Sequence, residues 1–232
     1  MATNKSKPTR AQVQLLVDAF LARQDEINMF RKQVVSFFEE SQVFNTKPLR
    51  LIHSIKSRIK DPDHLLEKIN RKWYKGMTPE TLFSDINDLA GVRVIHLYTE
   101  QFQKIHEAIQ GHIKKGYWVL FEQPVAYSWD PETTNYFMGL GLRAETRETY
   151  YTSIHYVVKP HSASDITCEI QVRTLFEEAW GEIDHAINYP CKTEIVACRE
   201  QLRVLAKLSS TGTRLADSIF RSHSASQIEK DV

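Results

Sequence analysis

The segment Cys168–Thr174 places polar side chains at every second position of an otherwise apolar run. Its Glu169, Gln171 and Arg173 alternate with two β-branched residues. Successive side chains of a β-strand point to opposite faces, so these three polar residues share one face. Such a strand either forms the solvated face of a two-sided sheet or presents a carboxylate, an amide and a guanidinium to a charged ligand.

A second segment, residues 151–155, has the same alternation. If it is a strand, Tyr151, Ser153 and His155 fall on one face, and the two residues between them fall on the other. Two strands that each gather polar groups on one face favour a ligand site over a solvated surface.

Length and composition fit one large globular domain, or a domain with helical extensions. The chain has 232 residues, of which 42% are hydrophobic and 25% are charged. No apolar run approaches 18 residues and the N-terminus lacks the apolar core of a signal peptide, so we expect no membrane segment. Three cysteines without a C-x-x-C pair are typical of free thiols in a reducing cytoplasm.

The net charge of +1 excludes bulk electrostatic binding, and we expect no DNA partner. The charge is nevertheless uneven along the chain. Residues 46–75 contain nine Lys or Arg against three Asp or Glu, a local excess of six. This excess predicts a polyanionic ligand held at one place.

The hydrophobic periodicity predicts an α+β fold, with a mixed sheet of about five strands flanked by helices. We expect strands at residues 92–98, 117–127, 150–160 and 166–173, and helices at residues 10–40, 49–74, 99–115, 175–188 and 193–220, the first of them as one long helix or two shorter ones. The second of these helices is expected to break at Pro62, and the last to bend at residues 209–213. Residues 128–149 read as a long loop.

Five segments in order resemble the synthetase domain of the RelA/SpoT family, which makes guanosine alarmones. They are the basic segment with Lys56-Ser-Arg-Ile-Lys60 and Lys68, then Asp88-Leu-Ala-Gly-Val-Arg93, Tyr151-Thr-Ser-Ile-His155, Glu169-Ile-Gln-Val-Arg-Thr174 and Asp184-His185. The resemblance covers about residues 45–190 and implies a nucleotidyltransferase-like sheet. We therefore divide the chain into a helical extension at 1–44, the synthetase domain at 45–190 and a second helical extension at 191–232.

The resemblance implies roles for the acidic and basic residues. Asp88 and Glu169 match the catalytic, Mg²⁺-binding pair, although Asp85 competes with Asp88 for the metal. The ATP-binding cations would be Arg58, Lys60 and Lys68. On a helix, residues two apart do not face each other, so the first two would converge only if the helix ended near Pro62.

The acceptor nucleotide would be bound by a further set of residues that match the family motifs. Tyr151 would stack on the guanine, and the others would contact phosphate or support the site: Ser153, His155, Gln171 and Arg173. Two departures from the family concern this half of the site. Tyr150 stands where the family has glycine, and Thr152 stands where it has arginine.

The function implied is that of a small stand-alone synthetase of the stringent response. It would transfer the β,γ-pyrophosphate of ATP to the 3'-hydroxyl of GDP or GTP in the cytoplasm. The resemblance is also compatible with a homo-oligomer. One alternative is a toxin-type relative that pyrophosphorylates the 3' end of tRNA. Another is a catalytically silent nucleotide-binding regulator, against which the intact Asp88 and Glu169 argue.

Overall fold

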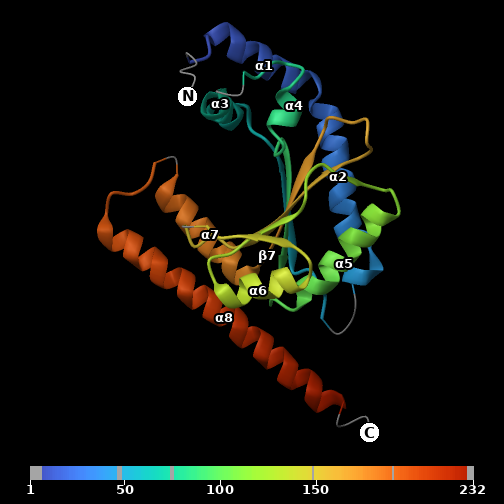
Figure 1. Ribbon diagram of the computed structural model, residues 1–232, viewed down its shortest axis with the longest axis vertical. Coiled ribbons are helices and arrows are strands. Elements are labelled where there is room, and N and C mark those ends of the chain that lie inside the picture. Colours follow the sequence, from blue (N-terminus) through green and yellow to red (C-terminus); the bar gives the residue numbers. More distant parts are fainter. Residues whose placement is uncertain (1–6, 46–48, 74–75, 148, 190, 229–232) are drawn as a thin grey trace.

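A mixed sheet runs through the centre of the molecule, with helices on both of its faces (Figure 1). The computed structural model describes residues 7–45, 49–73, 76–147, 149–189 and 191–228. Helices α2 and α5 lie on one side of the sheet, and α7 and α8 lie on the other. The predicted α+β architecture is therefore confirmed. Two lysines of the basic segment, Lys47 and Lys75, lie outside the described residues.

The described residues form seven strands in one sheet, whose main path has the order β1-β2-β7-β6-β4-β5, with β3 paired to β6. The pairs β2–β7 and β4–β5 are parallel, and the other pairs are antiparallel. The strands are β1 Ser54–Ile59, β2 Ala90–His96, β3 Val119–Leu120, β4 Val125–Tyr127, β5 Arg143–Glu145, β6 Ser153–Lys159 and β7 Cys168–Thr174.

Four of the helices begin at a residue whose side chain accepts from the first backbone N–H groups. Thr9 and Thr174 each form a capping box, and Asp61 and Asp130 each cap a helix that starts with proline. The helices are α1 Arg10–Ala22, α2 Gln24–Glu40, the 3₁₀ turn η1 Gln42–Phe44, α3 Pro62–Lys72, α4 Leu82–Asp85, α5 Gln101–Lys114, α6 Pro131–Gly139, α7 Leu175–Asn188 and α8 Val196–Ile228.

The helix predicted at residues 49–74 is wrong in its first half. That half forms β1, an edge strand that pairs antiparallel with β2, and α3 begins only at Pro62. The hydrophobic pattern predicted a helix here because an edge strand with one exposed face carries charged residues. Its short alternation resembles part of an amphipathic helix. In a strand, residues two apart share a face, so Arg58 and Lys60, which directly follows β1, can converge without the helix end that was expected.

Three further expectations need correction. The single strand at 117–127 is two short strands, because Pro124 interrupts it and has no N–H for the ladder. The expected loop at 128–149 contains α6 and β5, and the start of α6 was readable as Asp130 followed by proline.

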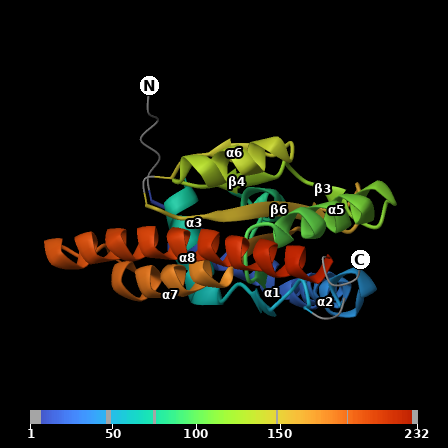
Figure 2. The same ribbon diagram turned by 90° about the horizontal axis from the view of Figure 1, so that it is seen from below.

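The bend expected at residues 209–213 is absent, since α8 is one helix of 33 residues. Its small residues allow close packing instead: a Cβ atom on Gly212 would lie 2.8 Å from the Phe176 ring on α7. Figure 2 shows α8 running along α7.

The hydrophobic core fills the space between α1, α2, α5 and one face of the sheet. Phe20, Phe38 and Phe102 from these helices are buried with Ile170 and Val172 of β7. The N-terminal helices thus share a core with the sheet, whose other face carries the polar residues. In the part of the chain that the structure describes, no helix combines the length and apolarity needed to cross a bilayer.

His96 is a buried histidine whose protonation should make the fold sensitive to acid. Its Nδ1 lies 2.9 Å from the carbonyl oxygen of Tyr98, and the ring packs near Phe102. Burial lowers the pKa of His96 to about 4. Between pH 6.5 and 4 the unfolded chain therefore binds a proton that the folded chain does not, and the folded state loses stability as the pH falls.

We predict that His96 alone accounts for a loss of up to about 3 kcal/mol in the free energy of unfolding between pH 6.5 and pH 4. Urea unfolding across this range measures it. The variant His96→Leu cannot bind the proton, so its unfolding free energy should fall less steeply with pH. Equal slopes in the two proteins would show that His96 does not carry the effect.

Candidate active site

Strand register brings polar residues of four strands into one row on the open face of the sheet. Lys56 of β1 is the partner of Arg93 on β2, which is the partner of Gln171 on β7, which in turn pairs with His155 on β6. Side chains of paired residues point to the same face. The next row brings Arg58, Gly91 and Glu169 together.

Two adjoining cavities lie on the β1 side of this face. The first, of about 370 Å³, has a lining that includes Lys56, Arg58, Asp88, Gly91, Arg93, Glu169, Gln171, Glu182 and His185. The second, of about 350 Å³, lies against α3 and is lined by Arg58, Lys60, His64, Glu67, Lys68, Arg71, His185 and Tyr189. We call the two together the β1–α3 cavity, because Arg58 and His185 line both parts.

A third cavity, of about 460 Å³, lies on the β4 side of the same face. We call it the β4–β6 cavity; its lining includes Lys72, Glu122, Tyr127, Arg147, Tyr151, His155 and Glu169. Among the described residues, Glu169 is the only one that lines this cavity as well as the β1–α3 cavity. Its carboxylate therefore stands where the contents of the two cavities would meet.

Asp88 is held by two lysines. Lys60 Nζ donates a hydrogen bond to its Oδ2 at 2.9 Å, and Lys68 Nζ lies 2.5 Å from its Oδ1. Burial alone would raise the pKa of Asp88, but the charges and hydrogen bonds of the two lysines lower it to about 2. Asp88 lines the β1–α3 cavity, whereas Asp85 is absent from the lining of all three cavities.

Glu169 accepts hydrogen bonds from two neighbours on the polar face. Gln171 Nε2 lies 2.7 Å from its Oε2, and His155 Nδ1 lies 3.2 Å from its Oε1. Burial by itself would raise the pKa of Glu169, but the hydrogen bond and charge of His155 dominate and lower it. The charge of Asp88, which lines the same cavity, acts in the opposite direction. Both are ionised at neutral pH.

Tyr151 extends this hydrogen-bonded chain into the β4–β6 cavity. Its hydroxyl lies 2.9 Å from His155 Nε2, so the imidazole ring of His155 links Tyr151 to Glu169. The preceding residue, Tyr150, points elsewhere. With φ at 59°, it is the only non-glycine residue in the left-handed region among those described, and its ring packs against Trp129.

Two of the residues expected at the acceptor site are covered. The Ser153 hydroxyl is buried and donates to the carbonyl oxygen of Val172 at 3.4 Å. Arg173 is buried in an ion pair of 2.6 Å with Glu178, and neither Ser153 nor Arg173 lines a cavity on this face. Gln171 lines the β1–α3 cavity rather than the one beside Tyr151.

Sequence reasoning missed several residues that line the cavities. Tyr127 lies in the three-residue β4, and the guanidinium of Arg147 sits 3.9 Å from the centre of its ring. Neither belongs to a recognisable motif, because the first is in a strand too short to show alternation and the second is in the expected loop. His185 was not missed, since it belongs to the fifth motif segment; its ring stacks on Tyr189 at 4.6 Å, whereas Asp184 of the same segment accepts a hydrogen bond from Asn188.

A row of cations beside two ionised carboxylates, placed between two cavities, meets the requirements of phosphoryl transfer between two ligands. The class of protein that the fold and the site define is thus a transferase acting on phosphorylated compounds. The family model described as a region found in RelA / SpoT proteins matches residues 57–194, which is more than half of the chain. The protein belongs to the RelA/SpoT family.

Individual relatives agree with this assignment. GTP pyrophosphokinase YjbM of Bacillus subtilis (strain 168) is 26% identical over 173 residues, covering 72% of this chain and 70% of that protein. A GTP pyrophosphokinase family protein from Streptococcus pneumoniae superposes with a TM-score of 0.64 at 19% identity, over 95% of this chain and 98% of that one. Small alarmone synthetase 1 from Bacillus subtilis, bound to its product pppGpp, gives 0.63 at 17% identity, over 88% and 96%.

Glu178 on α7 forms ion pairs with three cations of the sheet. It pairs with Lys56 at 2.8 Å, Arg173 at 2.6 Å and Arg93 at 3.4 Å. The Arg173 and Glu178 side chains are 3% and 5% exposed, so this pair is shielded from water. Removing one partner of such a pair leaves a buried charge without compensation.

We predict that Glu178→Ala lowers the free energy of unfolding by about 3–5 kcal/mol, measured by urea denaturation. The control is Glu182→Ala on the same helix, which removes a half-exposed partner of Arg93 and should cost less than about 1 kcal/mol. Replacing the pair together, as Arg173→Met with Glu178→Leu, should recover most of the loss. Similar losses for the two single variants would contradict the buried role of Glu178.

Proposed function

We propose that this protein is an ATP-dependent pyrophosphokinase that transfers the β,γ-pyrophosphate of ATP to the 3'-hydroxyl of GDP or GTP. The products are AMP and a guanosine 3'-pyrophosphate, the alarmone (p)ppGpp. The observation that carries the proposal is the position of Glu169 between two cavities of unlike lining. Membership of the RelA/SpoT family supports it, as do the names of the relatives.

The donor ATP occupies the β1–α3 cavity in this proposal. That cavity concentrates the basic residues of the chain, and its Arg58, Lys60 and Lys68 can neutralise a triphosphate. The stacked pair His185 and Tyr189 supplies an aromatic surface at the far end, where a purine base fits against Arg58. The phosphates then extend towards Asp88 and Glu169.

The acceptor occupies the β4–β6 cavity, with its guanine on Tyr151 and its phosphates near Lys72 and Arg147. The ring centres of Tyr127 and Tyr151 are 6.4 Å apart, so the two aromatic side chains form one wall. Arg147 brings a guanidinium to this cavity, whereas Thr152, at the usual arginine position, is buried away from it. Because Gln171 lines the other cavity and Arg173 and Ser153 are covered, we assign these three to support of Glu169 and the strand.

Mg²⁺ fits the carboxylates of the site. Mg²⁺ is commonly held by one or two carboxylates, with waters and substrate phosphates completing its shell. Asp88 and Glu169 are both ionised and line the same cavity. Bound there, Mg²⁺ would neutralise negative charge on the phosphate oxygens. Lys60 and Lys68 would then shift from Asp88 to the phosphates.

The transfer requires that the acceptor 3'-oxygen attack the β-phosphorus of ATP. The new bond joins these two atoms, the bond from the β-phosphorus to the α,β-bridging oxygen breaks, and AMP leaves. Glu169 accepts the proton of the hydroxyl, since its carboxylate faces both cavities. His155 and Gln171 hold that carboxylate in place through their hydrogen bonds.

We place the enzyme in the cytoplasm, where its nucleotide substrates occur, and the three free cysteines agree with a reducing compartment. We also propose that it forms homo-oligomers. Supporting this, the outer face of α8 exposes the large apolar side chains of Val204, Leu208, Leu215 and Ile219.

Product analysis tests the activity directly. The purified protein is incubated with γ-labelled ATP and Mg²⁺, and GDP, GTP or deacylated tRNA is supplied in turn. Label in a guanosine nucleotide supports the proposal. Label in tRNA alone would show the toxin-type activity instead, and no labelled product with any acceptor would show a protein without turnover.

We predict that Glu169→Gln lowers kcat by about 10²-fold or more, because it removes the charge needed for base or metal chemistry while nearly keeping the shape. Glu107→Gln, an exposed change on α5, serves as the control and should be fully active. Steady-state rates with saturating substrates measure the effect, and thermal unfolding checks the fold. Activity of Glu169→Gln within a few-fold of the unmodified protein would remove Glu169 from the mechanism.

Substitutions in the two cavities should separate the two substrates. We predict that Arg58→Ala raises the Michaelis constant for ATP more than that for the acceptor.

Tyr151→Ala should weaken acceptor binding by about ten- to a hundredfold, because base stacking contributes about 1–3 kcal/mol. Tyr151→Phe keeps the ring and should have only a mild effect on acceptor binding. The reverse pattern would mean that donor and acceptor occupy the opposite cavities.

A further inference from the structure

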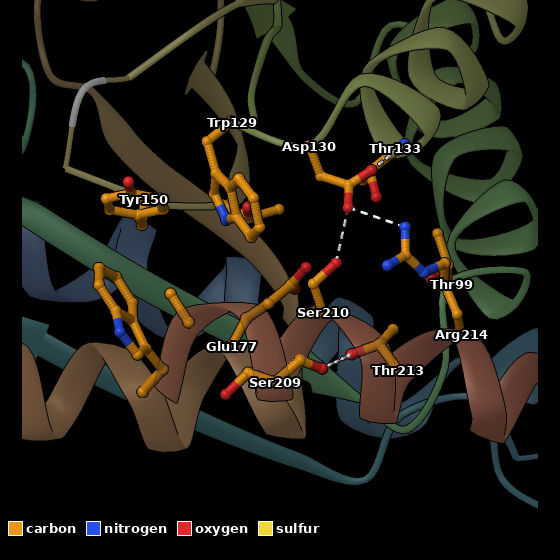
Figure 3. A pocket seen from close by; sticks show the side chains of 13 residues that line it. Thr99, Trp129, Asp130, Thr133, Tyr150, Glu177, Ser209, Ser210, Thr213 and Arg214 are labelled. Atoms are coloured by element: carbon orange, nitrogen blue, oxygen red, sulfur yellow. Dashed lines mark hydrogen bonds and ion pairs between the residues drawn. The ribbon is translucent and has the colours of Figure 1, made fainter. Parts of the chain in front are cut away.

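A small cavity of about 20 Å³ lies away from the sheet's polar face, between α6, α7 and α8 (Figure 3). Its lining includes Trp129, Asp130, Tyr150, Thr152 and Arg214. The space holds no more than a single water molecule, so it is no ligand site. Its walls nevertheless join α8 to the two segments that carry the aromatic residues of the β4–β6 cavity.

The first of two contacts between α8 and these segments, which we call the aromatic joint, involves aromatic rings. The rings of Trp129 and Tyr150 meet edge to face with centres 5.1 Å apart, and the guanidinium of Arg203 on α8 lies 5.8 Å from the centre of the Tyr150 ring. Tyr150 adopts a positive φ, which is unfavourable for a non-glycine residue. Such a conformation persists only when the surrounding contacts determine it, and here Trp129 and Arg203 supply them.

The second contact, which we call the ionic joint, connects Asp130 to α8. Asp130 Oδ1 caps α6 by accepting from the backbone N–H groups of Glu132 and Thr133 at 3.0 and 3.1 Å. Its Oδ2 accepts from Ser210 Oγ at 2.8 Å and from Arg214 Nη1 at 2.9 Å, both on α8 (Figure 3). The Asp130 side chain is only 7% exposed, so its carboxylate is shielded from water, while the Arg214 side chain is 42% exposed.

Both joints lie next to the acceptor residues in the chain. Trp129 and Asp130 follow Tyr127 by two and three residues, and Tyr150 immediately precedes Tyr151. Tyr127 and Tyr151 both line the β4–β6 cavity. One helix therefore holds the ends of two segments whose aromatic rings form the same wall.

We propose that α8 acts as a clamp that fixes the spacing of Tyr127 and Tyr151 and thereby sets the affinity for the acceptor nucleotide. The clamp consists of Asp130, Tyr150, Arg203, Ser210 and Arg214. These are positioning residues, since none of them lines either substrate cavity. The effect on affinity rests on the proposed function, whereas the effect on the two segments does not.

The test compares three variants on α8. Arg214→Ala removes the cation of the ionic joint, and Arg214→Lys keeps a cation there. Arg221→Ala is the matched control, because it removes an exposed ion pair of the same helix, 3.3 Å from Glu100, without touching the clamp. Hydrogen exchange of residues 125–130 and 149–155 is measured without substrate, and the Michaelis constants for GDP and ATP are measured with kcat.

In Arg214→Ala, both segments should exchange faster, and the Michaelis constant for GDP should rise about three- to tenfold. The constant for ATP and kcat should stay within about twofold, and Arg214→Lys and Arg221→Ala should resemble the unmodified protein. Unchanged exchange and an unchanged GDP constant would overturn the clamp, as would a loss of kcat with both constants unchanged, which indicates a merely structural helix. If the unmodified protein transfers nothing, the proposed function fails, and the exchange rates alone decide whether the clamp exists.

Discussion

The parallel pairing of β2 with β7 is the constraint on which the site depends. It sets Gly91 opposite Glu169, so that Asp88, which precedes β2, shares a cavity with the carboxylate of the neighbouring strand. Gly91 contributes no side chain, and a Cβ atom there would meet nothing within 4 Å, which leaves this part of the sheet open to a ligand. A shift of the register by one residue would send Glu169 into the apolar core.

The cations on the polar face of the sheet require carboxylates beside them. The cations of the β1–α3 cavity would repel one another without the carboxylates among them. Asp88 compensates Lys60 and Lys68, and Glu178 compensates Lys56 and Arg93. Buried ion pairs contribute little net stability. In the proposed function, this arrangement instead holds cations ready for the phosphates of the substrates.

The β4–β6 cavity is built differently from the β1–α3 cavity. Its aromatic wall comes from the short β4 and from the segment before β6, neither of which is fixed by a long strand. Contacts with α6 and α8 take that role, and the left-handed Tyr150 turns one tyrosine towards α8 while the next faces the cavity. The departure from the family's glycine is therefore accommodated by an aromatic contact rather than by a free backbone.

The sequence by itself determined the fold class, the strands β2, β6 and β7 and the helix α7, because each has a clear period of two or 3.6 residues and, for α7, a capping box. It also identified four candidate site residues whose motifs lie on or directly before those strands: Asp88, Glu169, Tyr151 and His155. It misassigned β1, missed α6, and gave no sign of Tyr127 or Arg147 as cavity residues. Short edge strands and loop residues are fixed by their partners in space, and their local pattern is too brief to predict them. Only the tertiary structure decided that Arg173 and Ser153 are covered and that Gln171 faces the β1–α3 cavity. It alone also showed that α8 contacts the segments that carry the aromatic wall of the β4–β6 cavity. Each of these features depends on how distant segments pack together.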